Sequence, residues 1–157
     1  MDKVPFEQLY IALYPGLYRL AQSILRQTAD AQDAVQQAAL KAWTARDRMK
    51  PGLEKAYITR IVVNECRNIQ RARQRKMPAL FPSPTASDVN TSDPDVKSII
   101  ESLPDTLRLP LLLRYMEGYS EKDAAAVLGI TVNTLKARLR RGKAKLREQS
   151  MEIWEES

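Results

Sequence analysis

The chain has 157 residues, enough for one medium-sized domain or two small ones, and its 25 basic against 19 acidic side chains give a net charge of +6. This excess of positive charge favours a polyanionic partner. With no histidine and one cysteine, Cys66, the composition excludes a zinc site, an internal disulfide and histidine-dependent catalysis. No apolar run approaches the length of a membrane span and no signal peptide opens the chain. We therefore expect a cytoplasmic protein with no membrane insertion, no cofactor, no metal and no catalytic residue.

The charge is unevenly distributed along the chain. Residues 1–76 carry 14 basic and 7 acidic groups and residues 96–148 carry 11 and 6, whereas the segments 77–95 and 149–157 each carry three acids and no base. The segment 77–95 contains four prolines among serine, threonine and aspartate and lacks apolar periodicity, which is typical of a flexible linker. The sequence therefore predicts an all-α fold with two small helical domains, 1–76 and 96–148, joined by this linker and followed by an acidic tail.

The first predicted helix covers residues 5–27. Apolar side chains recur along it at helical spacing and indicate one face packed into a core. Pro15 and Gly16 interrupt this pattern, because proline lacks a backbone N–H and clashes with the preceding turn. We expect the helix to be kinked or split at this point.

The second predicted helix opens at Asp30 and has two different sides. Its buried side consists of small residues and one tryptophan: Ala31, Ala34, Val35, Ala38, Ala42 and Trp43. Its other side is mostly polar but includes a leucine that we expect to be exposed, and it consists of Asp33, Gln36, Gln37, Leu40 and Thr44. By themselves these residues favour a merely solvated face. A metal site at Asp30 and Asp33 is disfavoured because no third acidic ligand has a clear place.

A basic connector over residues 45–52, ARDRMKPG, leads into a third helix that runs from Leu53 to about Lys76. The predicted apolar stripe of this helix comprises Tyr57, Ile58, Ile61, Val62, Cys66 and Ile69. Its C-terminal part is rich in cations, namely Arg67, Arg71, Arg73, Arg75 and Lys76. Cations suit the C-terminus of a helix dipole, but this density exceeds that need, and a phosphate-binding surface is the better interpretation.

Two short helices are expected between the linker and the last motif. The first covers residues 95–103. The second starts at Pro104, is bent by Pro110 and ends at Gly118. We predict that the core of this second helix consists of Leu107, Leu109, Leu111, Leu112 and Tyr115.

The stretch around which the chain is organised is SEKDAAAVLGITVNTLKARLRRGKAKLRE, residues 120–148. Ser120 can cap a first helix, Gly129 suits the turn that follows, and Thr131 can cap a second helix. Three leucines of the second helix share one face: Leu135, Leu139 and Leu146. The remaining positions are polar or basic, which favours a helix-turn-helix that enters a DNA major groove over a helical hairpin with a solvated basic face.

Four stretches, in order, resemble the extracytoplasmic-function group of bacterial RNA polymerase sigma factors. The start of that family's first domain is similar to YPGLYRLAQSIL (14–25), and its helix for the clamp helices of the largest polymerase subunit is similar to DAQDAVQQAALKAW (30–43). Its promoter-melting helix is similar to AYITRIVVNECRNIQRARQR (56–75), and its second domain resembles residues 103–148. The resemblance implies a transcription initiation factor that binds core RNA polymerase and both double- and single-stranded promoter DNA.

The resemblance also assigns roles to individual residues. It implies core-polymerase contacts at Asp33, Gln36, Gln37 and Leu40, which replaces the interpretation of a merely solvated face. For the −10 element it implies base capture by the connector and the third helix, with phosphate contacts from the two arginines of that helix: Arg46, Arg48, Lys50, Asn64, Arg67 and Arg71. For the −35 element it implies contacts from Asn133, Thr134, Lys136, Arg138, Arg140 and Arg141.

The chain departs from the family pattern at four positions. The family usually has an acidic residue and an aromatic one where this chain has Gln37 and Ala39, and often has Asp and Gly where it has Asn68 and Asn133. The first two differences would retune the polymerase contact, and the last affects the detail of the turn. The family also implies a contact with the flap of a large polymerase subunit and an anti-sigma partner.

Two other classes of function are alternatives to the sigma-factor interpretation. A stand-alone helix-turn-helix regulator would bind DNA without polymerase, but the first 76 residues show neither a ligand-pocket signature nor a dimerisation seam. A metal-dependent nuclease would need a convergent acidic cluster. Because the chain has few aromatic residues for separating strands, we also predict that it melts only promoters with particular −10 bases.

Overall fold

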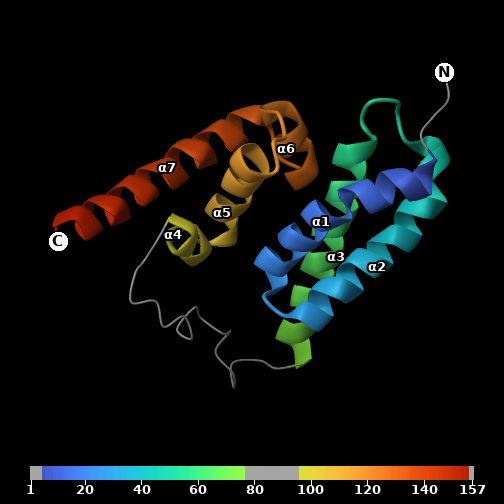
Figure 1. The fold of residues 1–157 in the computed structure, drawn as a ribbon, viewed down its shortest axis with the longest axis horizontal. Coiled ribbons are helices and arrows are strands. Elements are labelled where there is room, and N and C mark those ends of the chain that lie inside the picture. Colours follow the sequence, from blue (N-terminus) through green and yellow to red (C-terminus); the bar gives the residue numbers. More distant parts are fainter. Residues whose placement is uncertain (1–4, 77–95, 156–157) are drawn as a thin grey trace. The chain divides into compact units, whose positions relative to one another are not determined.

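The computed structural model describes residues 5–76 and 96–155, and the side chains of residues 5–75 and 98–149 within them. Every regular element in these ranges is a helix, so the predicted all-α fold is confirmed (Figure 1). The chain divides into two compact units: the first comprises the residues up to Lys76 together with Ala126–Gly129, and the second comprises the rest. The predicted linker over residues 77–95 lies outside the described residues.

The first unit is built from three helices that pack on one another: α1 (Phe6–Leu25), α2 (Thr28–Ala45) and α3 (Glu54–Lys76), with the short 3₁₀-helix η1 (Arg46–Arg48) after α2 (Figure 1). The buried side of α2 is lined by alanine and valine, which lets the neighbouring helices approach closely. The core consists of Leu17, Leu20, Ala21, Ile24 and Leu25 from α1, Ala31, Ala34, Val35, Ala38 and Ala42 from α2, and Ile58, Val62, Val63 and Cys66 from α3. The burial of apolar surface in this core contributes about 25 cal/mol per Å² to the free energy of folding.

Helix α1 is continuous through Pro15, so of the two predicted outcomes, a kink or a split, the split is wrong. The helix ends at Leu25, and its C-cap residue Arg26 has a left-handed φ of 61° and donates its N–H to the carbonyl oxygen of Gln22 at 2.8 Å. Helix α2 then begins at Thr28, before the predicted start at Asp30, because Gln27 is already extended and serves as its N-cap.

Two aromatic residues assigned to buried stripes are instead substantially exposed. Trp43 is 42% exposed and Tyr57 is 41% exposed. Each directly follows a buried residue, Ala42 or Ala56, and successive helical residues are rotated by roughly 100° about the axis. Both rings therefore leave the core at the edge of the apolar stripe.

Polar groups inside the first unit are few and specific. The hydroxyl of Tyr10 donates to the carbonyl oxygen of Val35 at 2.5 Å, which ties α1 to α2. Burial raises the pKa of this hydroxyl, and the nearby Tyr14 adds to the effect. Burial likewise raises the pKa of the Cys66 thiol to about 12, with a smaller contribution from the charge of Glu65. Both groups are therefore neutral at physiological pH.

The helices after residue 95 are α4 (Val96–Ser102), α5 (Asp105–Leu111), the π-helical turn η3 (Leu112–Met116), α6 (Glu121–Leu128) and α7 (Val132–Glu155), and they form the second unit except for the end of α6 (Figure 1). Helices α4 and α5 both pack on α7. The backbone widens after Pro110, and the N–H of Glu117 donates to the carbonyl oxygen of Leu112 at 2.9 Å. Tyr115 lies in this turn and is 54% exposed, so its predicted place in the core is wrong.

The burial of the Arg108 side chain was not predicted from the sequence. The side chain is 1% exposed, donates to the carbonyl oxygen of Leu103 at 2.7 Å and forms an ion pair with Asp105. The guanidinium thus joins the end of α4 to the first turn of α5. A buried charge of this kind is tolerated because its donors have partners.

The helix-turn-helix has the predicted local chemistry. The Ser120 hydroxyl accepts the N–H of Asp123 at 3.0 Å, and the Thr131 hydroxyl accepts the N–H of Thr134 at 3.1 Å. Between the two helices, Gly129 adopts a φ of +69°, a backbone conformation that residues with a Cβ rarely adopt. Helix α7 continues past Glu148 into the predicted acidic tail, whose residues 156–157 lie outside the described range.

Candidate nucleic-acid and protein interfaces

Helix α2 carries the first candidate surface, which we call the α2 face: Asp33, Gln36, Gln37 and Leu40. All four side chains are exposed, and their spacing of three and four residues places them on one side of the helix, away from the alanines of the core. Leu40 is 65% exposed. A row of polar groups ending in an exposed leucine suits a protein partner better than a nucleic acid.

The C-terminal end of α2 has an aromatic cluster that the sequence did not reveal. The guanidinium carbon of Arg46 lies 3.6 Å from the centre of the Trp43 ring, and Arg46 donates to the Trp43 carbonyl oxygen at 2.6 Å. Phe6 packs edge-on against the same ring, with 5.6 Å between centroids. Arg46, predicted to contact the −10 element, is therefore held against α2, whereas Arg48 and Lys50 are exposed. The i,i+3 spacing of Trp43 and Arg46 was the available signal.

Helix α3 carries the second candidate surface, which we call the α3 face: Asn64, Arg67 and Arg71. Asn64 and Arg71 are exposed and Arg67 is half-buried, again at spacings of three and four residues. The guanidinium of Arg71 donates to the amide oxygen of Asn68 at 2.5 Å. Asn68 therefore still offers the oxygen acceptor that the family's aspartate would supply. An amide flanked by cations is suited to a base and its neighbouring phosphates.

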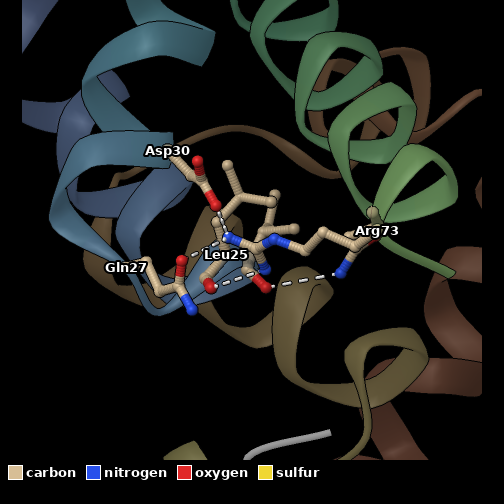
Figure 2. Close-up of polar contacts among 6 residues, drawn as sticks. Leu25, Gln27, Asp30 and Arg73 are labelled. Carbon is tan, nitrogen blue, oxygen red and sulfur yellow. Dashed lines mark hydrogen bonds and ion pairs between the residues drawn. The ribbon is translucent and has the colours of Figure 1, made fainter. Parts of the chain in front are cut away.

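Arg73 does not belong to that surface. Figure 2 shows its guanidinium directed toward Leu25, Gln27 and Asp30, at the corner between α1 and α2. It donates to the carbonyl oxygen of Leu25 at 3.1 Å and to the Gln27 side chain at 3.3 Å, and forms an ion pair with Asp30. Its predicted role in phosphate binding is wrong, because these internal acceptors already occupy the fork. No local pattern could reveal partners more than forty residues away in the chain.

A second ion pair joins the C-terminal part of α2 to the middle of α3. Lys41 lies next to Leu40, and its ammonium group pairs with the carboxylate of Glu65. The Glu65 side chain is only 10% exposed, whereas that of Lys41 is 58% exposed. No interaction of Lys41 or Glu65 was predicted from the sequence.

Helix α7 carries the third candidate surface, which we call the α7 face. The predicted −35 residues divide by exposure: Asn133, Lys136, Arg140 and Arg141 are exposed, whereas Thr134 and Arg138 are half-buried. The Thr134 hydroxyl lies 2.8 Å from that of Thr131, so it takes part in the turn. The first turn of α7 contains no acidic residue. The exposed part of this helix is therefore suited to phosphates and to the acceptor edges of guanine.

A small patch beside α7 was missed by the sequence reasoning. Tyr115 and Met116 are 54% and 60% exposed, and the ammonium nitrogen of Lys143 lies 4.9 Å from the centre of the Tyr115 ring. Lys143 is therefore drawn toward η3. Its distance of 28 residues from Tyr115 explains why no motif indicated the contact.

The described part of the chain offers little for other chemistries. Within the described residues 5–76 and 96–155, no group of three or more His, Cys, Asp or Glu side chains could hold a metal ion. None of the helices in these ranges is both long enough and apolar enough to span a membrane.

Comparisons with known proteins agree with this geometry. The family model of sigma-70 region 2 matches residues 9–76, and that of sigma-70 region 4 matches residues 95–146. The ECF RNA polymerase sigma factor SigM of Mycobacterium tuberculosis is 32% identical over 152 residues, covering 92% of this chain and 76% of that protein. The RNA polymerase sigma-E factor of Streptomyces avermitilis is 29% identical over 154 residues, covering 94% of this chain and 86% of that protein.

A solved structure shares the architecture as well. The sigma factor RpoE of Bartonella quintana, crystallised with the anti-sigma factor NepR, superposes with a TM-score of 0.76 at 28% identity, covering 91% of this chain and 94% of that one. Two family models in the same order, together with relatives across most of the chain, confirm the resemblance seen in the sequence. The chain belongs to the ECF family of RNA polymerase sigma factors.

Proposed function

We propose that this sigma factor binds core RNA polymerase through the α2 face, reads the −10 element with the α3 face and the connector residues Arg48 and Lys50, and reads the −35 element with the α7 face. Such a factor supplies recognition rather than catalysis, and it acts in the cytoplasm, where its proposed partners are. The observation that carries the proposal is the alignment of Asp33, Gln36, Gln37 and Leu40 on the one exposed side of a helix whose other side is fully packed.

The exposed leucine allows an estimate of the contact. Burying a leucine side chain completely stabilises a complex by about 1.5–3 kcal/mol. Leu40 is 65% exposed, so its burial by a partner is worth about 1–2 kcal/mol. Its removal should weaken polymerase binding by about 5- to 30-fold.

Core binding tests the α2 face directly. A Gln36→Ala, Leu40→Ala double variant should bind core polymerase at least tenfold more weakly than the wild type in a fluorescence-anisotropy titration, as expected when about 1.4 kcal/mol or more of contact energy is lost. A matched control is Gln8→Ala with Ile11→Ala on α1, because Gln8 is exposed and Ile11 is 72% exposed. If the Gln36→Ala, Leu40→Ala variant binds core polymerase as tightly as the Gln8→Ala, Ile11→Ala control does, this assignment is overturned. A wild type that binds promoter DNA but no polymerase would indicate a stand-alone regulator.

The two DNA surfaces call for different measurements. Asn64→Ala and Arg71→Ala should reduce permanganate reactivity of thymines in the −10 element while leaving core binding intact. Arg140→Ala should cost about 1–3 kcal/mol and relax preference at one −35 base pair, whereas Lys145→Ala should weaken binding to all sequences alike. Unchanged preference in the Arg140 variant would exclude base contact by this residue.

An anti-sigma partner is part of the proposal. The RpoE structure contains NepR, and CnrH, solved in complex with the cytosolic domain of CnrY, superposes on this chain with a TM-score of 0.65 at 26% identity. We expect a partner of this class to compete with core polymerase. Weaker binding of the wild-type protein to core polymerase when an anti-sigma factor is added to the anisotropy titration would support this expectation.

A further inference from the structure

Two ion pairs join α2 to α3, and their positions bracket the α2 face and most of the α3 face of the first unit. On α2, the paired residues Asp30 and Lys41 enclose the whole α2 face. On α3, the paired residues Glu65 and Arg73 enclose two of the three α3-face residues, and Asn64 directly precedes Glu65. We call the Asp30–Arg73 and Lys41–Glu65 pairs the two ties.

The tie at Arg73 is a multiple contact. Its guanidinium reaches the Leu25 carbonyl, the Gln27 side chain and the Asp30 carboxylate at once (Figure 2). A planar fork with several donors has one geometry in which all of these acceptors are satisfied. This tie therefore fixes one end of α3 against the start of α2.

The tie at Lys41 fixes the middle of α3 against the C-terminal part of α2. The Glu65 side chain is 10% exposed, so its carboxylate has lost most of its water and needs a charged partner. Lys41 supplies that partner from a position adjacent to Leu40. A slide of α3 by one helical turn, about 5.4 Å, would separate both pairs at once.

Stability alone is a poor explanation for two such pairs. Partly buried ion pairs often contribute little net stability, because desolvation offsets their attraction, and apolar replacements of similar volume are frequently neutral. A role in setting a unique register is the better-supported use of buried polar groups when two arrangements of similar packing compete. The buried side of α2 consists mainly of alanines, whose small side chains would allow α3 to pack in more than one register.

We propose that the two ties set the register between the α2 face and the α3 face, so that Asp30, Lys41, Glu65 and Arg73 are positioning residues for promoter opening. The inference rests on the proposed function, because it presumes polymerase on one face and the −10 element on the other. Polymerase held on α2 would then present the α3 face at a fixed place relative to the DNA strand. Loss of a tie would misplace that face without removing any contact to polymerase or DNA.

A charge-reversal cycle tests this proposal on the full chain. Lys41→Glu and Glu65→Lys each break the same tie, and the double variant restores a pair of opposite charges. We expect each single reversal to lower open-complex formation, measured by permanganate footprinting, by about tenfold, within the range of coupling seen for contacting residues. The double variant should recover to within about twofold, and core affinity should change by less than about threefold in all three.

The second tie and the controls complete the design. Arg73→Met should also lower opening by about tenfold, whereas Gln74→Ala, at an exposed neighbouring position, should not. Glu7→Lys controls for the change in net charge, since Glu7 is exposed on α1. Circular dichroism establishes that each variant is folded.

The outcomes separate the two levels of inference. Normal opening by the single reversals, or a double variant as defective as the singles, would overturn the role of the ties. A parallel loss of core affinity and opening would also overturn it, because the side chains would then act on polymerase or on the fold as a whole. Wild-type protein that fails to bind core polymerase would instead overturn the proposed function itself.

Discussion

Gly142 offers a quantitative test of how α7 is seated on the second unit. It lies in the interior of α7, and a Cβ built on it would meet Leu111 Cδ1 at 2.9 Å and Cγ at 3.3 Å, with the Leu107 carbonyl oxygen at 3.5 Å. Leu111 is only 3% exposed, so its end has little room to move. Glycine at this position therefore lets α5 approach the recognition helix closely.

Two opposing effects determine the result of Gly142→Ala. Alanine is favoured over glycine in a helix interior by about 1 kcal/mol. Overpacking a filled core costs about 1–3 kcal/mol. We expect a net destabilisation of about 1 kcal/mol, which lowers the melting temperature of a unit of this size by about 4–8 °C. Gly142→Val, which adds two further carbons, should cost about 3 kcal/mol.

The assay is scanning calorimetry of the full chain, with hydrogen exchange of α5 and α7 amides to assign the transition to the second unit. Ala144→Gly is the matched control, because Ala144 is exposed in the same helix and reports propensity alone. It should destabilise by about 1 kcal/mol. A Gly142→Ala variant stabilised by the same amount would refute the reasoning, since it would show that Leu111 yields at no cost.

Three further predictions follow from buried polar groups. Arg108→Met should destabilise the second unit by about 1–2 kcal/mol in urea denaturation, because it leaves the buried Leu103 carbonyl oxygen without its donor, whereas Asp105 is 44% exposed and stays hydrated; equal stability would contradict this. Tyr10→Phe should cost about 1–2 kcal/mol by the same method, since it deprives the Val35 carbonyl of its donor, and the exposed Tyr14→Phe should cost nothing. The fold raises the pKa of Cys66 from 9.0 to about 12, so its contribution to stability is complete below pH 9 and is lost as the pH rises toward 12. Cys66→Val should remove that part of the alkaline loss in a denaturation series, and an unchanged pH profile would contradict the burial of a neutral thiol.

Local chemistry was the part of the fold that the sequence predicted best. Ser120, Gly129 and Thr131 act within one helical turn, and each has the predicted role. The exposure of the α2 face was predicted equally well, because buried alanines that recur at spacings of three and four residues among polar ones leave one choice of buried side. In these cases the information lies within a few residues.

The errors occurred where an outcome depends on distant segments. Trp43, Tyr57 and Tyr115 are apolar enough for a core, but the position of the neighbouring helix decides whether the edge of a stripe is covered. Arg73 was interpreted as a phosphate contact because its acceptors lie on α1 and α2, out of reach of any local motif. Arg108 escaped notice for the same reason that buried arginines usually do, since charge by itself predicts exposure.

The burial of the single cysteine makes the protein a convenient subject for labelling. Cys66 is inaccessible and its thiol is neutral, so the natural chain presents no reactive sulfur to a maleimide at pH 7. Cysteines introduced at two exposed positions, Gln8 in the first unit and Thr106 in the second, would carry a fluorophore pair while Cys66 stays in place. Energy transfer between them would follow the separation of the two units in real time as polymerase, promoter and inhibitor are added.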